Sequence, residues 1–196
     1  MGDRVADPKA LGFGAFAMMA WVYSMQHAGW YANGSYAATL HGAAAFATVA
    51  LLIAALASFL RGETWHAVFF MFWSALLMGY RAGPAGVDAV GGWYLLTIAL
   101  VSFFLFLRAL KDGLGVPVVL LAIGVALSFL LYALGSWLGG VFWVVVGGYV
   151  GLLTALATFW AAASALGIIG GGAGGASSGA VGGGSVGGGM SPGGMS

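Results

Sequence analysis

The sequence predicts an all-α integral membrane protein, a bundle of six transmembrane helices. Of the 196 residues, 62% are hydrophobic and only 6% are charged, whereas an ordinary soluble domain carries about 25% charged residues. Long apolar runs are separated by short breaks that combine turn formers with charged residues or glycine pairs. Six basic and five acidic side chains cannot coat a water-soluble surface, so the lipid bilayer is the expected surrounding.

The six expected spans follow from the length that crosses a bilayer, roughly 20 apolar residues for about 30 Å of hydrocarbon. They cover residues 11–32, 37–60, 65–80, 87–107, 116–138 and 142–169. The third is the shortest, and the sixth is long enough to extend past the bilayer. Residues 11–169 are therefore expected to form one transport domain, preceded by a cytoplasmic segment over 1–10. Residues 170–196, rich in glycine and serine, are expected to be a flexible cytoplasmic tail.

The basic residues predict the orientation of the bundle. With six spans, the N-terminus, the second and fourth loops and the tail lie on one side. That side holds Arg4, Lys9, Arg61, Arg108 and Lys111, and the other holds Arg81. Because loops rich in lysine and arginine stay in the cytoplasm, we predict a multi-pass protein of the cell membrane with both termini inside.

The first span begins at a distinctive pair. Asp7 can cap a helix with its carboxylate, and Pro8 suits the first helical position. A helix N-terminus carries partial positive charge from its unpaired N–H groups. We expect this terminus to lie at the mouth of a path for a small anion. Asp7 is either a simple cap there or a group that gates or takes up a proton.

The spans contain few ionisable side chains. Ionisable groups at membrane depth usually face the bundle interior or an aqueous cavity. His27, beside Gln26 near the outer end of the first span, is the best candidate to line a path; the alternative is a neutral ring bonded to a neighbouring helix. His41 and His66 lie on other spans. Without an i, i+4 pair or a carboxylate partner, no metal site is expected.

Several classes of function are disfavoured by the motifs. Residues 12–17 match the dinucleotide pattern GxGxxA, but no strand precedes them and no acidic residue follows about 20 positions later. Hydrolase, zinc-protease, ATP-binding and paired-carboxylate motifs are missing, so an enzyme and a bound cofactor are not expected. No basic patch is present to meet a nucleic acid.

Four short motifs together resemble a known family. Residues 7–13 read Asp-Pro-Lys-Ala-Leu-Gly-Phe, 26–30 read Gln-His-Ala-Gly-Trp, 61–65 read Arg-Gly-Glu-Thr-Trp, and 148–152 read Gly-Tyr-Val-Gly-Leu. In order and spacing they are similar to the acetate uptake transporter family, the family of succinate–acetate permeases. That family has Asn-Pro-Ala-Pro-Leu-Gly-Leu at the first motif, Gly-x-Thr-Phe at the third and Gly-Trp-Ile-Gly-Leu at the fourth. The resemblance covers about residues 6–166.

The resemblance implies a hexamer of six-helix subunits, each with its own pore for acetate or succinate, with transport coupled to protons. It places Phe16, Trp73 and Ile123 at the pore constriction, where the family has phenylalanine, tyrosine and leucine. The further path residues that we expect are Asp7, Pro8, Leu11, Gly12, Gln26, His27, Thr64, Tyr149 and Trp160.

The sequence also departs from the family pattern. Asp7 replaces the asparagine of the first motif, the second proline of that motif is missing, and Trp73 is larger than tyrosine. These departures bear on the substrate more than on the fold.

The expected mechanism follows from the charge of the substrate. Carboxylic acids titrate near pH 4 to 5, so acetate is an anion at neutral pH and costs many kcal/mol to move bare into low dielectric. Donors must replace its water: backbone N–H groups at residues 8–11 and the side chains of Gln26, His27 and Thr64. The constriction would exclude hydrated ions as an apolar neck. A urea or amide channel remains an alternative, as does a membrane sensor or assembly factor without transport.

Overall fold

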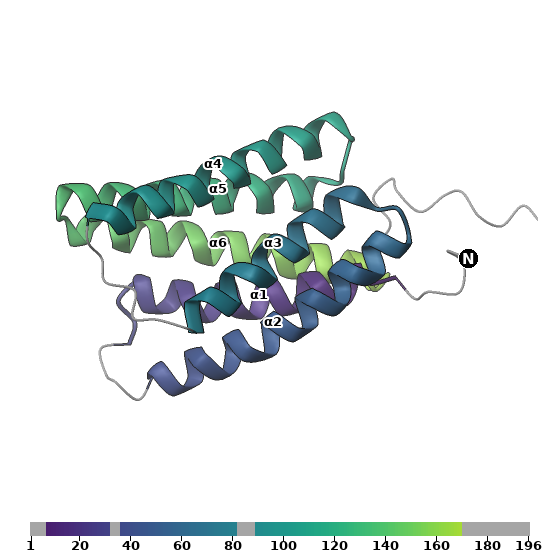
Figure 1. Cartoon of the computed structure of the whole chain (residues 1–196), viewed down its shortest axis with the longest axis horizontal. Helices are drawn as coiled ribbons and strands as arrows, with labels where there is room; N and C mark the ends of the chain where they lie inside the picture. The colour runs from purple at the N-terminus through teal and green to yellow at the C-terminus, as the bar shows by residue number, and fades with distance from the viewer. Residues whose placement is uncertain (1–6, 32–35, 82–88, 170–196) are drawn as a thin grey trace, which may run out of the picture.

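The computed structural model describes residues 7–31, 36–81 and 89–169, and within these ranges the chain is all-helical. The helices are α1 (Lys9–His27), α2 (Tyr36–Leu60), α3 (Thr64–Arg81), α4 (Ala89–Lys111), α5 (Val116–Leu138) and α6 (Val141–Ala165). They run roughly alongside one another in a single bundle (Figure 1). The predicted six-helix, all-α class is confirmed.

Two helices end earlier than their apolar runs predict. The first run was expected to reach residue 32, but α1 ends at His27, and Gly29 follows with φ +80°. The sixth was expected to reach residue 169, but α6 ends at Ala165 and Gly167 has φ +72°. Glycine adopts this left-handed conformation without the cost that a Cβ brings, so it ends a helix even inside an apolar run.

The start of α1 differs slightly from the expectation. Pro8 has helical dihedral angles but directly precedes the first helical residue, and its carbonyl accepts the Gly12 N–H at 3.0 Å. Asp7 Oδ1 accepts the N–H of Lys9 at 3.0 Å. The expected carboxylate cap is therefore present, although the helix begins at Lys9 rather than at Pro8.

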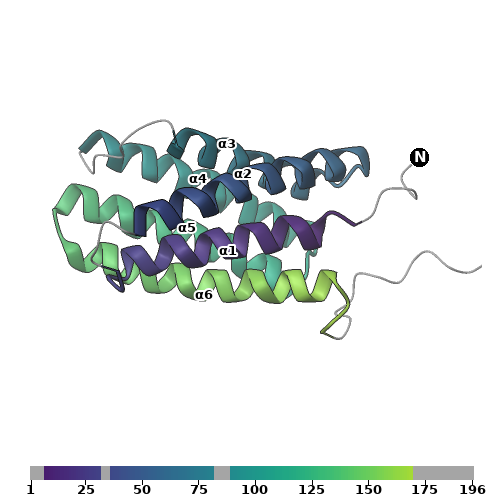
Figure 2. The ribbon, with the colours of Figure 1, turned by 90° about the horizontal axis from the view of Figure 1, so that it is seen from below.

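The helices pack in a definite order. α1 lies between α2 and α6, as Figure 2 shows, while α5 packs against α4 and α6 and α2 packs along α3. α1, α3 and α5 meet one another chiefly through aromatic side chains rather than by close backbone approach. The centre of the bundle is therefore filled by side chains from these three helices.

Within the described residues, four helices are long and apolar enough to cross a membrane: α2 over Ala38–Leu60, α4 over Gly91–Lys111, α5 and α6. In α3 the described apolar part, Thr64–Met78, is shorter. α1 has 19 residues, about 28 Å at 1.5 Å per residue, but its second half carries polar groups. Six spans were expected. Length and composition alone support four of them, and α1 and α3 run beside these four in the bundle (Figure 1).

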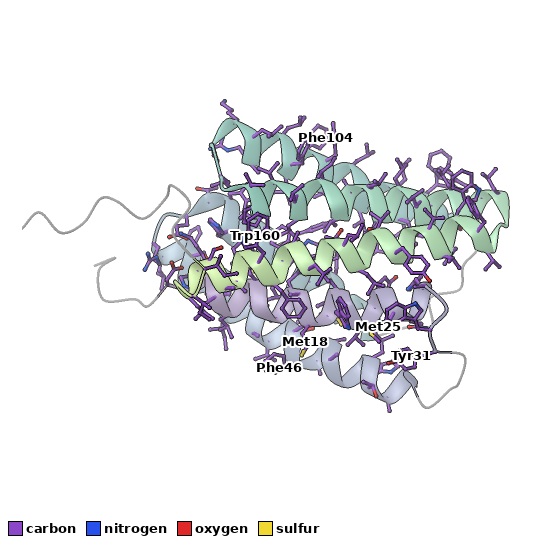
Figure 3. All side chains as sticks on the ribbon, turned by 180° about the vertical axis from the view of Figure 1, so that it is seen from behind. Met18, Met25, Tyr31, Phe46, Phe104 and Trp160 are labelled. Carbon is purple, nitrogen blue, oxygen red and sulfur yellow. The ribbon has the colours of Figure 1, made fainter. Side chains whose placement is uncertain are left out.

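Apolar side chains cover the outside of the bundle. Phe46 on α2 and Phe104 on α4 lie at opposite outer edges in Figure 3, and both are exposed. Leu153 on α6 is exposed as well. Since a membrane offers no water to solvate polar groups, an apolar exterior around a satisfied helical backbone is what lipid requires. The chain has the build of an integral membrane protein.

Close approach between helices depends on glycine at two positions of interest. A Cβ on Gly148 of α6 would collide with the backbone nitrogen of Ala28, at the end of α1. A Cβ on Gly12 of α1 would collide with the ring of Phe70 on α3. Small residues permit this kind of packing between membrane helices, and here they allow α6 to approach the end of α1 and the Phe70 ring of α3 to lie against the start of α1.

Candidate transport path

A column of aromatic rings runs through the centre of the bundle, between α1, α3 and α5. Consecutive rings along it have centroids about 4 to 6.5 Å apart. We call this set the aromatic column. Its members are Phe13, Phe16, Tyr23 and His27 of α1, His66, Phe69, Phe70 and Trp73 of α3, and Phe129 and Tyr132 of α5.

Helical spacing explains why these rings share one interior. Side chains three, four or seven residues apart lie on the same face of an α-helix. Phe13, Phe16, Tyr23 and His27 follow this spacing along α1. The residues at 66, 69, 70 and 73 do so along α3, and those at 129 and 132 along α5. Each helix therefore turns one aromatic stripe toward the same axis.

One tightly packed group of rings lies around Phe16 and Trp73. The Phe16 centroid is 4.9 Å from that of Trp73 and 5.2 Å from that of Phe69, and the Trp73 centroid is 5.4 Å from that of Phe129. Phe16 and Trp73 are only 4% and 6% exposed. We call Phe16, Trp73 and Phe129 the neck. Two of the three residues expected at the constriction thus meet, while Ile123 is half-buried on α5, six residues before Phe129.

Nε1 of Trp73 is buried in this part of the column without a hydrogen-bond partner. The hydroxyl of Tyr132 is buried too, and the side chain of Ser24 lies beside it, at the contact with Gly151. A buried donor left unpaired costs about 1–3 kcal/mol, so each such group in a native structure asks for an explanation. A solute that accepts a hydrogen bond inside the column would be such an explanation.

The polar pair near the end of α1 separates into two environments. His27 packs against Tyr23 and Tyr132, with ring centroids 4.2 and 4.6 Å away, and its Nδ1 lies 2.9 Å from the carbonyl oxygen of Tyr23. Because a carbonyl oxygen only accepts, Nδ1 donates this bond. Gln26 is exposed, since neighbouring residues point about 100° apart on a helix. The structure therefore brings His27 into the column and leaves Gln26 outside it.

The column ends at a group of charged side chains. Glu63 Oε1 lies 3.2 Å from Lys9 Nζ and 3.2 Å from Arg61 Nε, and Glu63 Oε2 lies 3.5 Å from His66 Nδ1. Asp7 is 4.0 Å from Lys9 Nζ. We call this end of the bundle, where α1 begins and α2 turns into α3, the charged end. The α4–α5 turn lies at the same end in Figure 1.

The other expected site residues take varied positions. Pro8 and Gly12 are buried, whereas Leu11 and Thr64 are exposed near the charged end. Tyr149 and Trp160 of α6 are 49% and 43% exposed.

Neither α6 residue belongs to the aromatic column. Trp160 is labelled on α6 in Figure 3, and the hydroxyl of Tyr149 accepts a bond from Trp30 Nε1 at 3.4 Å. The structure of this chain therefore does not bring Tyr149 or Trp160 to the neck.

Several residues of the site were missed from the sequence. They are Phe13, Tyr23, Phe69, Phe70, Phe129 and Tyr132 of the column and Lys9 and Glu63 of the charged end. The aromatic stripes at helical spacing were a usable signal for the column. No comparable signal pairs Lys9 with Glu63, because they are far apart in the sequence and only the packing of α1 against the α2–α3 turn joins them.

Comparison with known proteins finds the same fold. The chain is similar to a solved structure of the bacterial acetate channel SatP, a succinate–acetate permease, with a TM-score of 0.76 and 18% identity. The match covers 83% of this chain and 93% of that one. No family model and no curated protein matches the sequence. The resemblance seen in the motifs is confirmed at the level of the fold.

Proposed function

We propose that this chain forms a transmembrane channel for acetate and related small carboxylates, including succinate. The observation that carries the proposal is Trp73 Nε1, a buried donor without a hydrogen-bond partner, inside an aromatic column that also buries the hydroxyl of Tyr132. The fold shared with an acetate channel supports the same conclusion. An enzyme is not proposed, because no catalytic constellation was found in the sequence.

The two ends of acetate suit the two features of the column. Its methyl group can pack on the rings of Phe16 and Phe129, while its carboxylate accepts hydrogen bonds from Trp73 and Tyr132. The described column holds no lysine or arginine, so the anion is held by neutral donors. Such a site releases its solute readily, as conduction requires.

The neck acts as a filter in this proposal. The rings of Phe16 and Trp73 fill the centre of the bundle, so passage requires them to rotate aside. An apolar constriction of this kind excludes hydrated ions by dewetting, and the size of the opening limits which carboxylates pass.

The proposal is tested by replacing Phe16 with alanine and measuring uptake of carboxylates of increasing size into proteoliposomes. We expect Phe16→Ala to admit carboxylates larger than those that the wild type passes. Phe104→Ala, which removes a ring from the outer surface of α4, is the matched control and should behave as the wild type. An unchanged size limit in Phe16→Ala would show that the neck is assigned wrongly.

Proton coupling is a second part of the proposal. It needs a titratable group on the path, and His27 in the column and Asp7 at the charged end are the candidates. Uptake should lose its dependence on pH when His27 and Asp7 are both replaced by asparagine. A pH dependence that survives in the double variant would remove both residues from this role.

We also propose that the chain assembles as a hexamer and that both of its termini lie in the cytoplasm. The hexamer is supported by the motif resemblance, and the orientation by the distribution of lysine and arginine in the sequence. Mass measurement of the detergent-purified protein tests the first, and protease accessibility of the C-terminal tail in oriented vesicles tests the second.

A channel for urea or small amides is the alternative. It is favoured by one observation, the neutral lining of the described column, since a neutral solute needs no positive field. Urea presents mostly hydrogen-bond donors, and Trp73 also offers only a donor. A carboxylate, which only accepts, is therefore the better match to Trp73. Uptake of acetate measured against uptake of urea separates the two functions.

A further inference from the structure

A second polar site lies at the charged end, and His66 is the member of the aromatic column that it includes. It is centred on the carboxylate of Glu63, at the start of α3. Oε1 lies 3.2 Å from both Lys9 Nζ and Arg61 Nε. Oε2 lies 3.5 Å from His66 Nδ1, and it is buried without a well-formed hydrogen bond. Two cationic side chains and the ring of His66, from two segments of the chain, therefore surround one carboxylate.

The backbone holds Glu63 firmly in this place. Gly62 turns the chain with φ +74°, and the N–H of Glu63 donates to Ser58 O at 3.0 Å. The carbonyl of Glu63 accepts the N–H of Ala67 at 3.0 Å in the first turn of α3. The side chain alone is free to leave, because its backbone is fixed by α2 on one side and α3 on the other.

The site is continuous with the aromatic column. The ring of His66, which faces Glu63, lies 5.7 Å from Phe13 and 6.2 Å from Phe70 between centroids. Lys9 opens α1, the helix that carries Phe13 and Phe16. A solute that leaves the column at this end therefore meets the Glu63 site next.

We infer that this cluster is a binding site for a small carboxylate and that Glu63 is its built-in occupant. The side chain of glutamate ends in a CH₂–COO⁻ group, the same chemistry as acetate. Lys9, Arg61 and His66, which hold the Glu63 carboxylate, would hold an acetate carboxylate in the same way. The inference rests on the proposed function and names monocarboxylates as the class that exchanges with Glu63.

The exchange is expected at millimolar concentrations of solute. Lys9 and Glu63 are partly exposed, and ion pairs of this kind shift an equilibrium by about fivefold or less. A group tethered by a short flexible arm competes with an effective concentration in the millimolar range. Free acetate at a similar concentration can therefore displace the Glu63 carboxylate. Glu63 is then a weak competitor of acetate, and it sets how tightly the charged end binds its solute.

The test measures acetate binding directly, by saturation-transfer NMR on the purified full-length protein. Glu63→Gln removes the competing charge and keeps the size of the side chain. We expect the apparent dissociation constant for acetate to fall about fivefold, which corresponds to about 1 kcal/mol. Adding Lys9→Met to Glu63→Gln should reverse the gain. Asp112→Asn is the control, because this carboxylate is paired with Arg108 at 2.7 Å in the α4–α5 turn.

Further variants keep the result decisive. If Glu63→Gln does not fold, as judged by its elution and circular dichroism, Glu63→Asp serves instead, since the shorter side chain draws the carboxylate away from Lys9. An affinity for acetate that is equal in the wild type and the folded Glu63 variant would overturn the inference. Wild-type uptake of acetate into proteoliposomes is scored separately, so failure of the channel proposal would show there and not in the binding assay.

Discussion

The neck and the charged end share helices α1 and α3, with α5 completing the neck and the α2–α3 turn completing the charged end, yet their polar groups are in opposite situations. In the neck, Trp73 Nε1 is buried with no partner among apolar rings. At the charged end, Lys9 and Arg61 are already bonded to Glu63 of the same chain. If both proposals hold, one path separates two tasks. The neck would then select by size and by one unpaired donor, whereas the charged end would hold a carboxylate that a solute must displace.

The largest change in stability and uptake is expected from a substitution at the contact between α1 and α3, the two helices that the neck and the charged end share. Gly12→Ala places a Cβ into the ring of Phe70, so this ring of the aromatic column must shift. Overpacking of this kind costs about 1–3 kcal/mol. We expect a lower melting temperature in detergent and altered uptake.

Gly14→Ala is the matched control for this variant. Gly14 lies two residues further along α1 and has nothing within 4 Å of an added Cβ. Alanine there should raise stability by up to about 1 kcal/mol through helix propensity. Equal melting temperatures for the two variants would contradict the packing of α1 on α3.

The next effect tests the unpaired donor of the neck. Trp73→Phe removes the N–H and keeps an aromatic ring. Hydrogen bonds to charged groups contribute about 1.5–3 kcal/mol, so we expect acetate uptake to fall by about tenfold or more. Trp73→Tyr, which keeps a donor, should retain more uptake than Trp73→Phe, and Trp160→Phe, on an exposed ring of α6, should change nothing. Similar losses in Trp73→Tyr and Trp73→Phe would assign the role of Trp73 to ring size alone.

The sequence predicts the features that local residues set, such as helix ends, better than the contacts between distant segments. Charged breaks and glycine pairs predicted all six helices, because these residues end helices through local chemistry. The end of α1 was placed too late, since only the conformation of Gly29, not the hydrophobicity around it, stops the helix. Phe16 and Trp73 were paired through the family resemblance, and their contact in the structure agrees with it.

Contacts between distant segments were beyond the sequence. Glu63 and Lys9 meet only because α1 packs against the α2–α3 turn, and no local pattern encodes that. Gln26 was taken with His27, yet only His27 faces the column. The helical phase set by Phe13 and Phe16 would have separated them. Trp160 could not be placed without knowing which face of α6 meets α1 and α5.

A smaller effect is expected at Tyr132, deeper along the column from the charged end. Tyr132→Phe removes one hydroxyl while keeping the ring that packs on His27 and Phe129. Because Ser24 lies beside this hydroxyl and can supply a donor in its place, we expect acetate uptake to fall by only about threefold, close to 0.7 kcal/mol. Uptake that falls more in Tyr132→Phe than in Trp73→Phe would move the main donor away from the neck.

Uptake of labelled acetate and labelled urea into proteoliposomes of the wild-type chain distinguishes a carboxylate channel from a urea channel. If neutral donors in the aromatic column carry a small carboxylate through the bundle, acetate enters well above the rate of empty liposomes and urea does not. Trp73→Phe then lowers the acetate rate. Acetate entry no faster than in empty liposomes, or urea entry at an equal or higher rate, would contradict a carboxylate channel.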